Sequence, residues 1–269
     1  MKIKQLLDDA VLRFNKPSFI ADDPIGIPHR FTGLQDREIM GFWTAVLAWG
    51  QRVTIIRSAE KLIDWMDGTP HAFITGHSEP ERARFERFVH RTFQGTDALY
   101  FLDFFQRYYA EHASLEEAFA RHLATGDLTT ERALIGFHRD FFDHPWAPRR
   151  TRKHIATPEG GSTCKRINMF LRWMVRRDEA GVDFGIWRRI QPSQLLMPLD
   201  VHVDRVARRL GLLTRRQTDW GAVLELTDKL RVLAPDDPVR YDFALFGLGV
   251  LDKLDLALSP YPDLRRSEP

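Results

Sequence analysis

The sequence predicts an all-α protein, and two observations lead to this prediction. Apolar residues recur at three- and four-residue spacing along most of the chain, and Pro, Gly and Asp separate the segments that carry this pattern. No stretch combines strict apolar–polar alternation with β-branched residues, so we expect no sheet. The 269 residues are 43% hydrophobic and 28% charged, a composition that favours a globular protein with a sizeable core over a disordered or fibrous one.

The sequence pattern of the N-terminal quarter predicts three helices and one loop. Residues 2–14 have an amphipathic pattern and form a short helix, whereas 15–34 contain three prolines and are expected to be a loop. Asp36 can cap an apolar helix that ends at Gly50. A second helix follows over about 53–66 and is closed by an Asp-Gly pair.

The rest of the chain continues the helical pattern. Helices are expected at about 80–91, 97–112, 114–124 and 128–143. His144-Pro145 and Pro148 then break the chain, because proline cannot continue a helix. Beyond this break we expect an apolar helix over 167–175 and another helix that begins at Asp200.

Cysteine content and hydropathy restrict the class of protein. The single cysteine, Cys164, excludes an internal disulfide, a four-cysteine iron–sulfur cluster and a zinc knuckle, and we expect no metal or cofactor. Asp8 and Asp9 interrupt the region where a signal peptide needs an apolar core. The most apolar window, 41–50, is half the roughly twenty residues that a membrane span needs. We therefore expect a cytoplasmic monomer with no membrane association.

Basic residues are concentrated in one part of the chain. The net charge is only +2, and arginine (31) far exceeds lysine (8). Between 149 and 216, however, the sequence contains 16 Lys and Arg but only 6 Asp and Glu, a net charge of +10 in 68 residues. Such a local excess indicates a polyanion-binding surface. The alternative is a solvated surface in an arginine-rich protein.

The first notable motif is PEGGSTCK at 158–165, which precedes an apolar helix. Gly160 and Gly161 allow a tight turn, and Ser162 or Thr163 can cap the helix. The backbone N–H groups of such a turn suit a phosphate. Lys165 lies in the first helical turn, where the helix dipole disfavours a cation. The alternative is a capped surface turn with an incidental lysine.

The second motif is MPLDVHVDRVARRLG at 197–211. Asp200 can be an N-cap, and capping alone could explain its presence. Val203, Val206 and Leu210 form the buried stripe of the helix, so its arginines face outward. His202 is interpreted as a packed or supporting imidazole, because no partner ligands lie at metal spacing.

The third motif is FWTAVLAWGQR at 42–52, an apolar helix that ends in Gly50 and is followed by Gln51 and Arg52. Taken together, the three motifs resemble the helix-hairpin-helix DNA glycosylases, the superfamily of endonuclease III and the 8-oxoguanine glycosylases. In that superfamily a glutamine after an apolar helix probes the DNA, a Gly-rich hairpin leads to a catalytic lysine, and a Val-Asp-x-His-Val-x-Arg-Val stretch carries the catalytic aspartate. The segments around Gln51, Lys165 and Asp200 are similar to these, and the resemblance covers roughly 35–255.

Two departures from the superfamily pattern narrow the resemblance. Ser162-Thr163 stands where the hairpin usually has its second glycine, and Lys165 and Asp200 are 35 residues apart, with an insertion around 178–194. This long spacing resembles the archaeal branch of 8-oxoguanine glycosylases. The chain is also similar to a bacterial family described only as a domain of unknown function, through Asp23-Pro-Ile and Tyr241-Asp-Phe-Ala-Leu-Phe-Gly.

The resemblance implies a fold, a substrate and a site. It implies two helical subdomains with a DNA-binding cleft between them: 41–195, ending in the hairpin at about 156–178 and the insertion, and 196–269, against which 1–40 packs. Lys165 would be the nucleophile that forms a Schiff base with the sugar of a damaged nucleotide in double-stranded DNA, most plausibly oxidised guanine, and Asp200 would stabilise the positive charge. DNA contacts are expected from Gln51, Arg52, Gly160, Gly161, Ser162, Thr163, Arg166, His202 and Arg205. A base pocket is expected from Trp49, Trp173, Asp242 and Phe243, although core positions for these aromatics and a cap for Asp242 are the alternatives.

Two other functions stay open on the sequence alone. One is a DNA- or RNA-binding protein that has the hairpin and the basic face but no catalytic activity. The other is a helical enzyme that acts on a small phosphorylated ligand, which needs a pocket that the sequence does not reveal.

Overall fold

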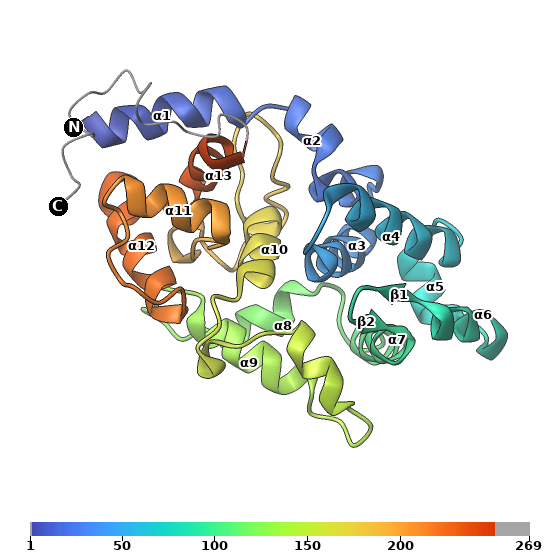
Figure 1. The fold of residues 1–269 in the computed structure, drawn as a ribbon. Coiled ribbons are helices and arrows are strands. Elements are labelled where there is room, and N and C mark those ends of the chain that lie inside the picture. The colour runs from blue at the N-terminus through green and yellow to red at the C-terminus, as the bar shows by residue number, and fades with distance from the viewer. Residues whose placement is uncertain (1, 251–269) are drawn as a thin grey trace.

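The computed structural model describes residues 2–250 and is mostly helical (Figure 1). Its α-helices are α1 (Lys2–Phe14), α2 (Ser18–Asp22), α3 (Leu34–Leu47), α4 (Arg52–Trp65), α5 (Pro70–Gly76), α6 (Glu79–Ala83), α7 (Gly95–Tyr109), α8 (Glu116–Ala120), α9 (Glu131–Phe141), α10 (Lys165–Val175), α11 (Val201–Arg209), α12 (Trp220–Leu233) and α13 (Asp242–Val250). Short 3₁₀ helices are η1 (Pro24–Gly26), η2 (Pro28–Arg30), η3 (Arg84–Arg87), η4 (Arg149–His154), η5 (Pro158–Gly160), η6 (Pro192–Gln194) and η7 (Pro238–Tyr241). The predicted helical fold class is confirmed.

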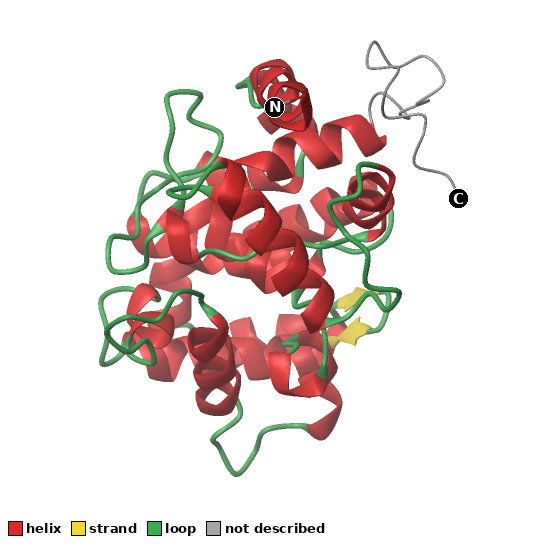
Figure 2. Ribbon diagram, turned by 90° about the vertical axis from the view of Figure 1, so that its left-hand side faces the viewer, coloured by secondary structure: helices red, strands yellow, loops and turns green. Residues whose placement is uncertain are grey.

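One small sheet departs from the expectation of none. Strands β1 (Val89–His90) and β2 (Phe93–Gln94) form an antiparallel pair near one edge of the molecule (Figure 2). Arg91, with φ of 54°, turns the chain between them. The pair is only two residues long, which is too short for sequence alternation to reveal. No helix within 2–250 is long and apolar enough to cross a membrane.

Helix α10 lies in the middle of the molecule, between two groups of helices (Figure 1). On one side α11 packs against α13, and α13 packs against α1 from the other end of the chain. The ring of Phe14 lies so close to Gly247 that a Cβ there would be 2.2 Å from it. On the other side α3 packs against both α10 and α4. Segments far apart in the sequence therefore meet around α10.

An aromatic cluster holds the second group of helices to α10. Phe42 of α3 is fully buried, and its ring contacts rings from three other helices, at centroid distances between 5.3 and 6.2 Å. These rings belong to Phe101, Phe105, Phe137, Phe141 and Phe170. Edge-to-face pairs of this kind add to the free energy gained by burying the rings. The cluster fixes where α10 lies.

Several local expectations about helix positions and caps are wrong. The expected loop at 15–34 contains α2, η1 and η2, because prolines are well tolerated at the start of short helices. The expected helix at 80–91 breaks into α6, η3 and β1. Asp36 does not cap its own helix, which starts after Gly33. Its carboxylate instead accepts the His71 N–H, at 2.8 Å, where α5 begins.

Glu38 is a fully buried carboxylate that joins four segments. It accepts hydrogen bonds from Trp187 Nε1 (2.7 Å), Ser114 Oγ (2.5 Å), Tyr109 OH (3.0 Å) and Leu115 N (3.0 Å). Burial raises its pKa, and these four donors oppose that effect. Both carboxylate oxygens are therefore satisfied, and Glu38 connects α3 with α7, the 114–115 turn and the 178–194 insertion.

We expect Glu38→Ala to lower the free energy of unfolding by roughly 3–5 kcal/mol, because it leaves three buried donors and the half-buried Ser114 hydroxyl without their acceptor. Urea unfolding measures this. Glu60→Ala is the matched control, since the Glu60 side chain is 42% exposed and, within 2–250, pairs only with Arg30 on the surface. A loss below about 1 kcal/mol for Glu38→Ala would show that the network adds little stability.

Candidate functional site

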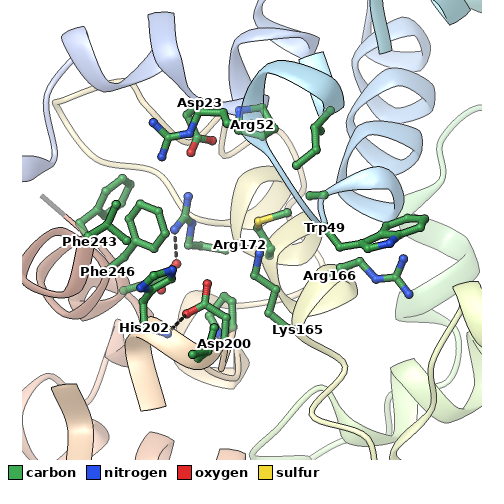
Figure 3. A pocket seen from close by; sticks show the side chains of 18 of the residues that line it. Asp23, Trp49, Arg52, Lys165, Arg166, Arg172, Asp200, His202, Phe243 and Phe246 are labelled. Carbon is green, nitrogen blue, oxygen red and sulfur yellow. Dashed lines mark hydrogen bonds and ion pairs between the residues drawn. The ribbon is translucent and has the colours of Figure 1, made fainter. Parts of the chain in front are cut away.

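A pocket of about 680 Å³ opens where five segments of the chain meet (Figure 3). The segments are 19–24, 48–55, 165–172, 198–202 and 242–250. Both Lys165 and Asp200 line it, as do four aromatic side chains and three further cationic ones. The site is thus assembled from the N-terminal segment, the α3–α4 junction, α10, α11 and α13.

Lys165 is the first residue of α10. The turn before it is tight: Gly161 has φ of 70°, and Cys164, the N-cap residue, has φ of 49°. The prediction that Ser162 or Thr163 caps α10 is wrong. Ser162 Oγ accepts the Cys164 N–H at 3.2 Å, so it stabilises the turn that comes before the helix. Within 2–250 the Lys165 amine has no hydrogen bond or ion pair and faces the pocket (Figure 3).

Asp200 caps α11, as predicted. Its Oδ1 accepts the backbone N–H groups of His202, at 2.9 Å, and Val203, at 3.0 Å. Both bonds use the same oxygen, and no described residue donates to Oδ2. The cap therefore orients the carboxylate and leaves one oxygen available to the pocket, at the positive end of a helix.

Asp242, the first residue of α13, lies near both groups. Its pKa is raised to about 6, because burial and the charge of Asp200 together outweigh the opposite effect of Arg172 and Lys165. The charges of Lys165 and Asp200 therefore both act on Asp242 in a single pocket. Arg172 forms an ion pair with Asp242. Figure 3 shows Lys165 and Asp200 below Arg172.

Arg172 belongs to a buried ion-pair network behind the pocket. It pairs with Asp242 and, at 3.1 Å, with Asp183, which also pairs with Arg176 at 3.0 Å. The Arg172 guanidinium lies 4.5 Å from the centre of the Phe243 ring. Asp183 comes from the 178–194 insertion. The insertion thus supplies a carboxylate that holds an arginine on the pocket wall.

Trp49 forms the wall on the α3 side. The guanidinium of Arg166 lies 4.8 Å from its ring, and the ring of His90 meets it edge-on at 4.8 Å. Arg166 donates to the carbonyl oxygens of Val46 (2.5 Å) and Lys153 (3.3 Å). Burial lowers the pKa of Arg166 to about 10. Arg166 therefore joins α10 to α3 and supports Trp49, besides lining the pocket.

The structure brings many of the sequence-predicted residues together. Those that line the pocket are Trp49, Arg52, Lys165, Arg166, Asp200, His202, Asp242 and Phe243. Gln51 is exposed and immediately precedes α4, outside the pocket lining. Gly160, Gly161 and Arg205 are also exposed, and Ser162 and Thr163 are half-buried.

Trp173 is a correction to the predicted base pocket. It is completely buried and does not line the pocket. Lys165, Met169 and Arg172 lie on one face of α10, because they are four and then three residues apart. Trp173 follows Arg172 directly, about 100° further round the helix, and its side chain is buried in the core.

Sequence reasoning missed several lining residues. Phe19, Asp23, Arg172 and Phe246 all line the pocket, and none was assigned a role. Arg172 could have been found, since it lies seven residues after Lys165 and therefore on the same helical face. Nothing in the local sequence places Phe19 and Asp23 beside α10, because long-range packing brings them there.

Comparison with known proteins gives one match. Residues 23–251 match the model of a family whose description is "Protein of unknown function (DUF2400)". No curated protein and no solved structure matches the chain. The matched range includes every segment of the pocket except Phe19, and it spans most of the 269 residues. The protein belongs to the DUF2400 family.

Proposed function

We propose that this protein is a DNA glycosylase with lyase activity that removes a damaged base, oxidised guanine, through a Schiff base on Lys165. One observation carries the proposal: an amine without an ionic partner in 2–250 and a carboxylate with a free oxygen open onto one pocket. A protein that only binds nucleic acid has no need for this combination.

The walls of the pocket suit a flipped base. A base in a duplex is stacked, so an enzyme that acts on it extrudes the nucleotide into a pocket. The volume of about 680 Å³ lies within the usual range for small-ligand sites. The aromatic rings that line it are Phe19, Trp49, Phe243 and Phe246, and rings of this kind stack on bases.

The chemistry follows from the two groups. The neutral amine of Lys165 attacks C1′ of the sugar, the bond from C1′ to the base breaks, and the base leaves as it takes up a proton. The attached amine then loses a proton, the C1′–O4′ bond breaks and O4′ is protonated, which gives the imine without loss of water. Asp200 Oδ2 stabilises the positive charge that develops on the sugar. β-Elimination from the imine then breaks the strand.

The segment before Lys165 supports a helix-hairpin-helix assignment. A short helix, η4, is followed by the tight turn at Gly161 and then by α10. Gly161 is exposed, so the turn is accessible to a phosphate. The exposed cations of η4, Arg149, Arg152 and Lys153, lie on the same stretch of chain. We propose that this turn and η4 hold the DNA backbone beside the pocket.

A panel of duplexes tests the function. Each duplex carries one lesion, such as 8-oxoguanine, a 3-alkylated adenine, uracil or an abasic site, and borohydride is added to reduce any imine. We expect a covalent protein–DNA adduct on the 8-oxoguanine and abasic duplexes. If the protein forms no adduct and releases no base from any duplex, the proposal is wrong.

We expect binding to duplex DNA to weaken steeply with salt. Of the basic residues in 149–216, Arg172 and Arg176 are buried in ion pairs and cannot reach phosphates. If the exposed ones contact about five phosphates, log K falls with a slope near −4 to −5 against log salt. Fluorescence anisotropy at several salt concentrations measures this slope, and a flat dependence would contradict a phosphate-contacting surface.

A further inference from the structure

Asp23 is a pocket carboxylate whose hydrogen bonding is incomplete. It is the residue before η1, and its Oδ1 accepts the Ile25 N–H at 3.0 Å. The residues from 2 to 250 provide no other hydrogen bond or ion pair to this carboxylate. Pro24 and Ile25 are buried and fix the turn, so Asp23 is held in place on the pocket wall (Figure 3).

The hydrogen bonding of Asp23 differs from that of Glu38. Glu38 accepts four hydrogen bonds, whereas Asp23 accepts one. Glu38 is fully buried and needs several donors to compensate for the loss of water, whereas Asp23 is half-buried and lines the pocket. A carboxylate oxygen that faces a pocket without a donor is thus available to a ligand.

The charges around Asp23 do not supply the missing donor. Burial raises its pKa, and the Ile25 N–H, Arg172, Arg52 and Lys165 act against this effect. Arg172 is already held by Asp183 and Asp242, and no ion pair joins Asp23 to Arg52 or Lys165 in the described chain. The cations therefore oppose the effect of burial without contacting the carboxylate.

We propose that Asp23 is a specificity-determining residue, whose free carboxylate oxygen accepts a hydrogen bond from a ring N–H of the bound base. This inference rests on the proposed function. A carboxylate here favours a base with an N–H where the undamaged base has a lone pair. Guanine presents its N7 lone pair as an acceptor, and oxidation at C8 places a proton on N7. Undamaged guanine in the pocket would set that lone pair against the carboxylate.

The test separates base recognition from catalysis and from folding. Asp23→Asn keeps an oxygen for the Ile25 N–H but presents an amide N–H to the pocket, which reverses the hydrogen-bonding pattern. We expect single-turnover excision of 8-oxoguanine to slow by roughly 10- to 100-fold, the range of one hydrogen bond to a charged group. Affinity for a duplex with a tetrahydrofuran abasic site should be unchanged, because that site has no base to recognise.

Two controls accompany this variant. Asp22→Asn makes the same change at the adjacent residue, which is exposed, and should leave excision at the wild-type rate. A duplex that carries 8-oxo-7-deazaguanine tests the wild-type protein itself, since a C–H replaces the N7–H. We expect a similar slowing with this substrate, whether or not Asp23→Asn folds well.

Each result has a distinct meaning. If the wild type excises 8-oxoguanine and Asp23→Asn does so at the same rate, this inference is wrong and the proposed function stands. Equal losses of abasic-site affinity and excision would show that Asp23 has only a structural role. Failure of the wild type on every lesion would refute the proposed function, and this inference with it.

Discussion

Lys165→Gln should eliminate both the borohydride-trapped adduct and the strand break, while binding to the same duplex weakens only modestly. Glutamine has similar length and polarity but no amine, so no imine can form. Arg166 cannot take over, because a guanidinium is protonated at neutral pH and is not a nucleophile. The Lys165 amine has no hydrogen bond or ion pair within 2–250, so the stability cost should stay within about 0.5 kcal/mol. Gel analysis of the reduced reaction measures the adduct.

Lys153→Gln is the matched control for this experiment. Lys153 is an exposed lysine of η4, and only its backbone carbonyl contacts Arg166, so the substitution keeps that contact. It should lower affinity through the loss of one charge and still form the adduct. An adduct with Lys165→Gln but not with Lys153→Gln would identify Lys153 as the nucleophile. An adduct with both would indicate another amine.

Local patterns predicted most of the long helices and the positions of Lys165 and Asp200 at helix starts, for a physical reason. The cap at Asp200 depends on a carboxylate next to the first N–H groups of a helix, and these are neighbours in the sequence. The position of Lys165 at the start of a helix could be predicted because a glycine turn comes just before it and an apolar run just after it. Interactions within four residues of each other leave a signature that can be read without the fold.

Predictions failed where contacts between segments far apart in the sequence decide the outcome. Trp173 and Arg172 are adjacent, yet Arg172 faces the pocket and Trp173 the core. An aromatic residue suits a base pocket by chemistry, but only the packing of α10 against α3 sets which side of the helix faces the pocket. The prediction that Asp36 caps its own helix failed for a similar reason, because its hydrogen-bond partner His71 belongs to another helix.

The insertion at 178–194 shows a third kind of limit. From the sequence it is only added length between Lys165 and Asp200. In the structure, Asp183 pairs with Arg172 and Arg176, and Trp187 donates to Glu38. Its role depends on partners that lie on α3 and α10, and no local pattern contains that information.

Asp200→Asn should slow base excision by at least 10²–10³-fold, while folding and DNA affinity stay close to wild type. The amide oxygen can still accept the N–H groups of His202 and Val203, so the cap remains and the stability cost is a few tenths of a kcal/mol. What is lost is the negative charge that faces the positive charge on the sugar, and removal of one such preorganised interaction typically has an effect of this size. Single-turnover kinetics on an 8-oxoguanine duplex measures the rate.

Asp219→Asn is the control that separates charge at the site from capping in general. Asp219 caps α12 by accepting the Ala222 N–H at 3.1 Å, pairs with Arg215, and does not line the pocket. Its replacement should leave excision unchanged, since it removes a carboxylate from a helix N-terminus that takes no part in the reaction. If Asp200→Asn also kept the wild-type rate, Asp200 would be a capping residue like Asp219, and the charge on the sugar would have to be stabilised by another carboxylate of the pocket.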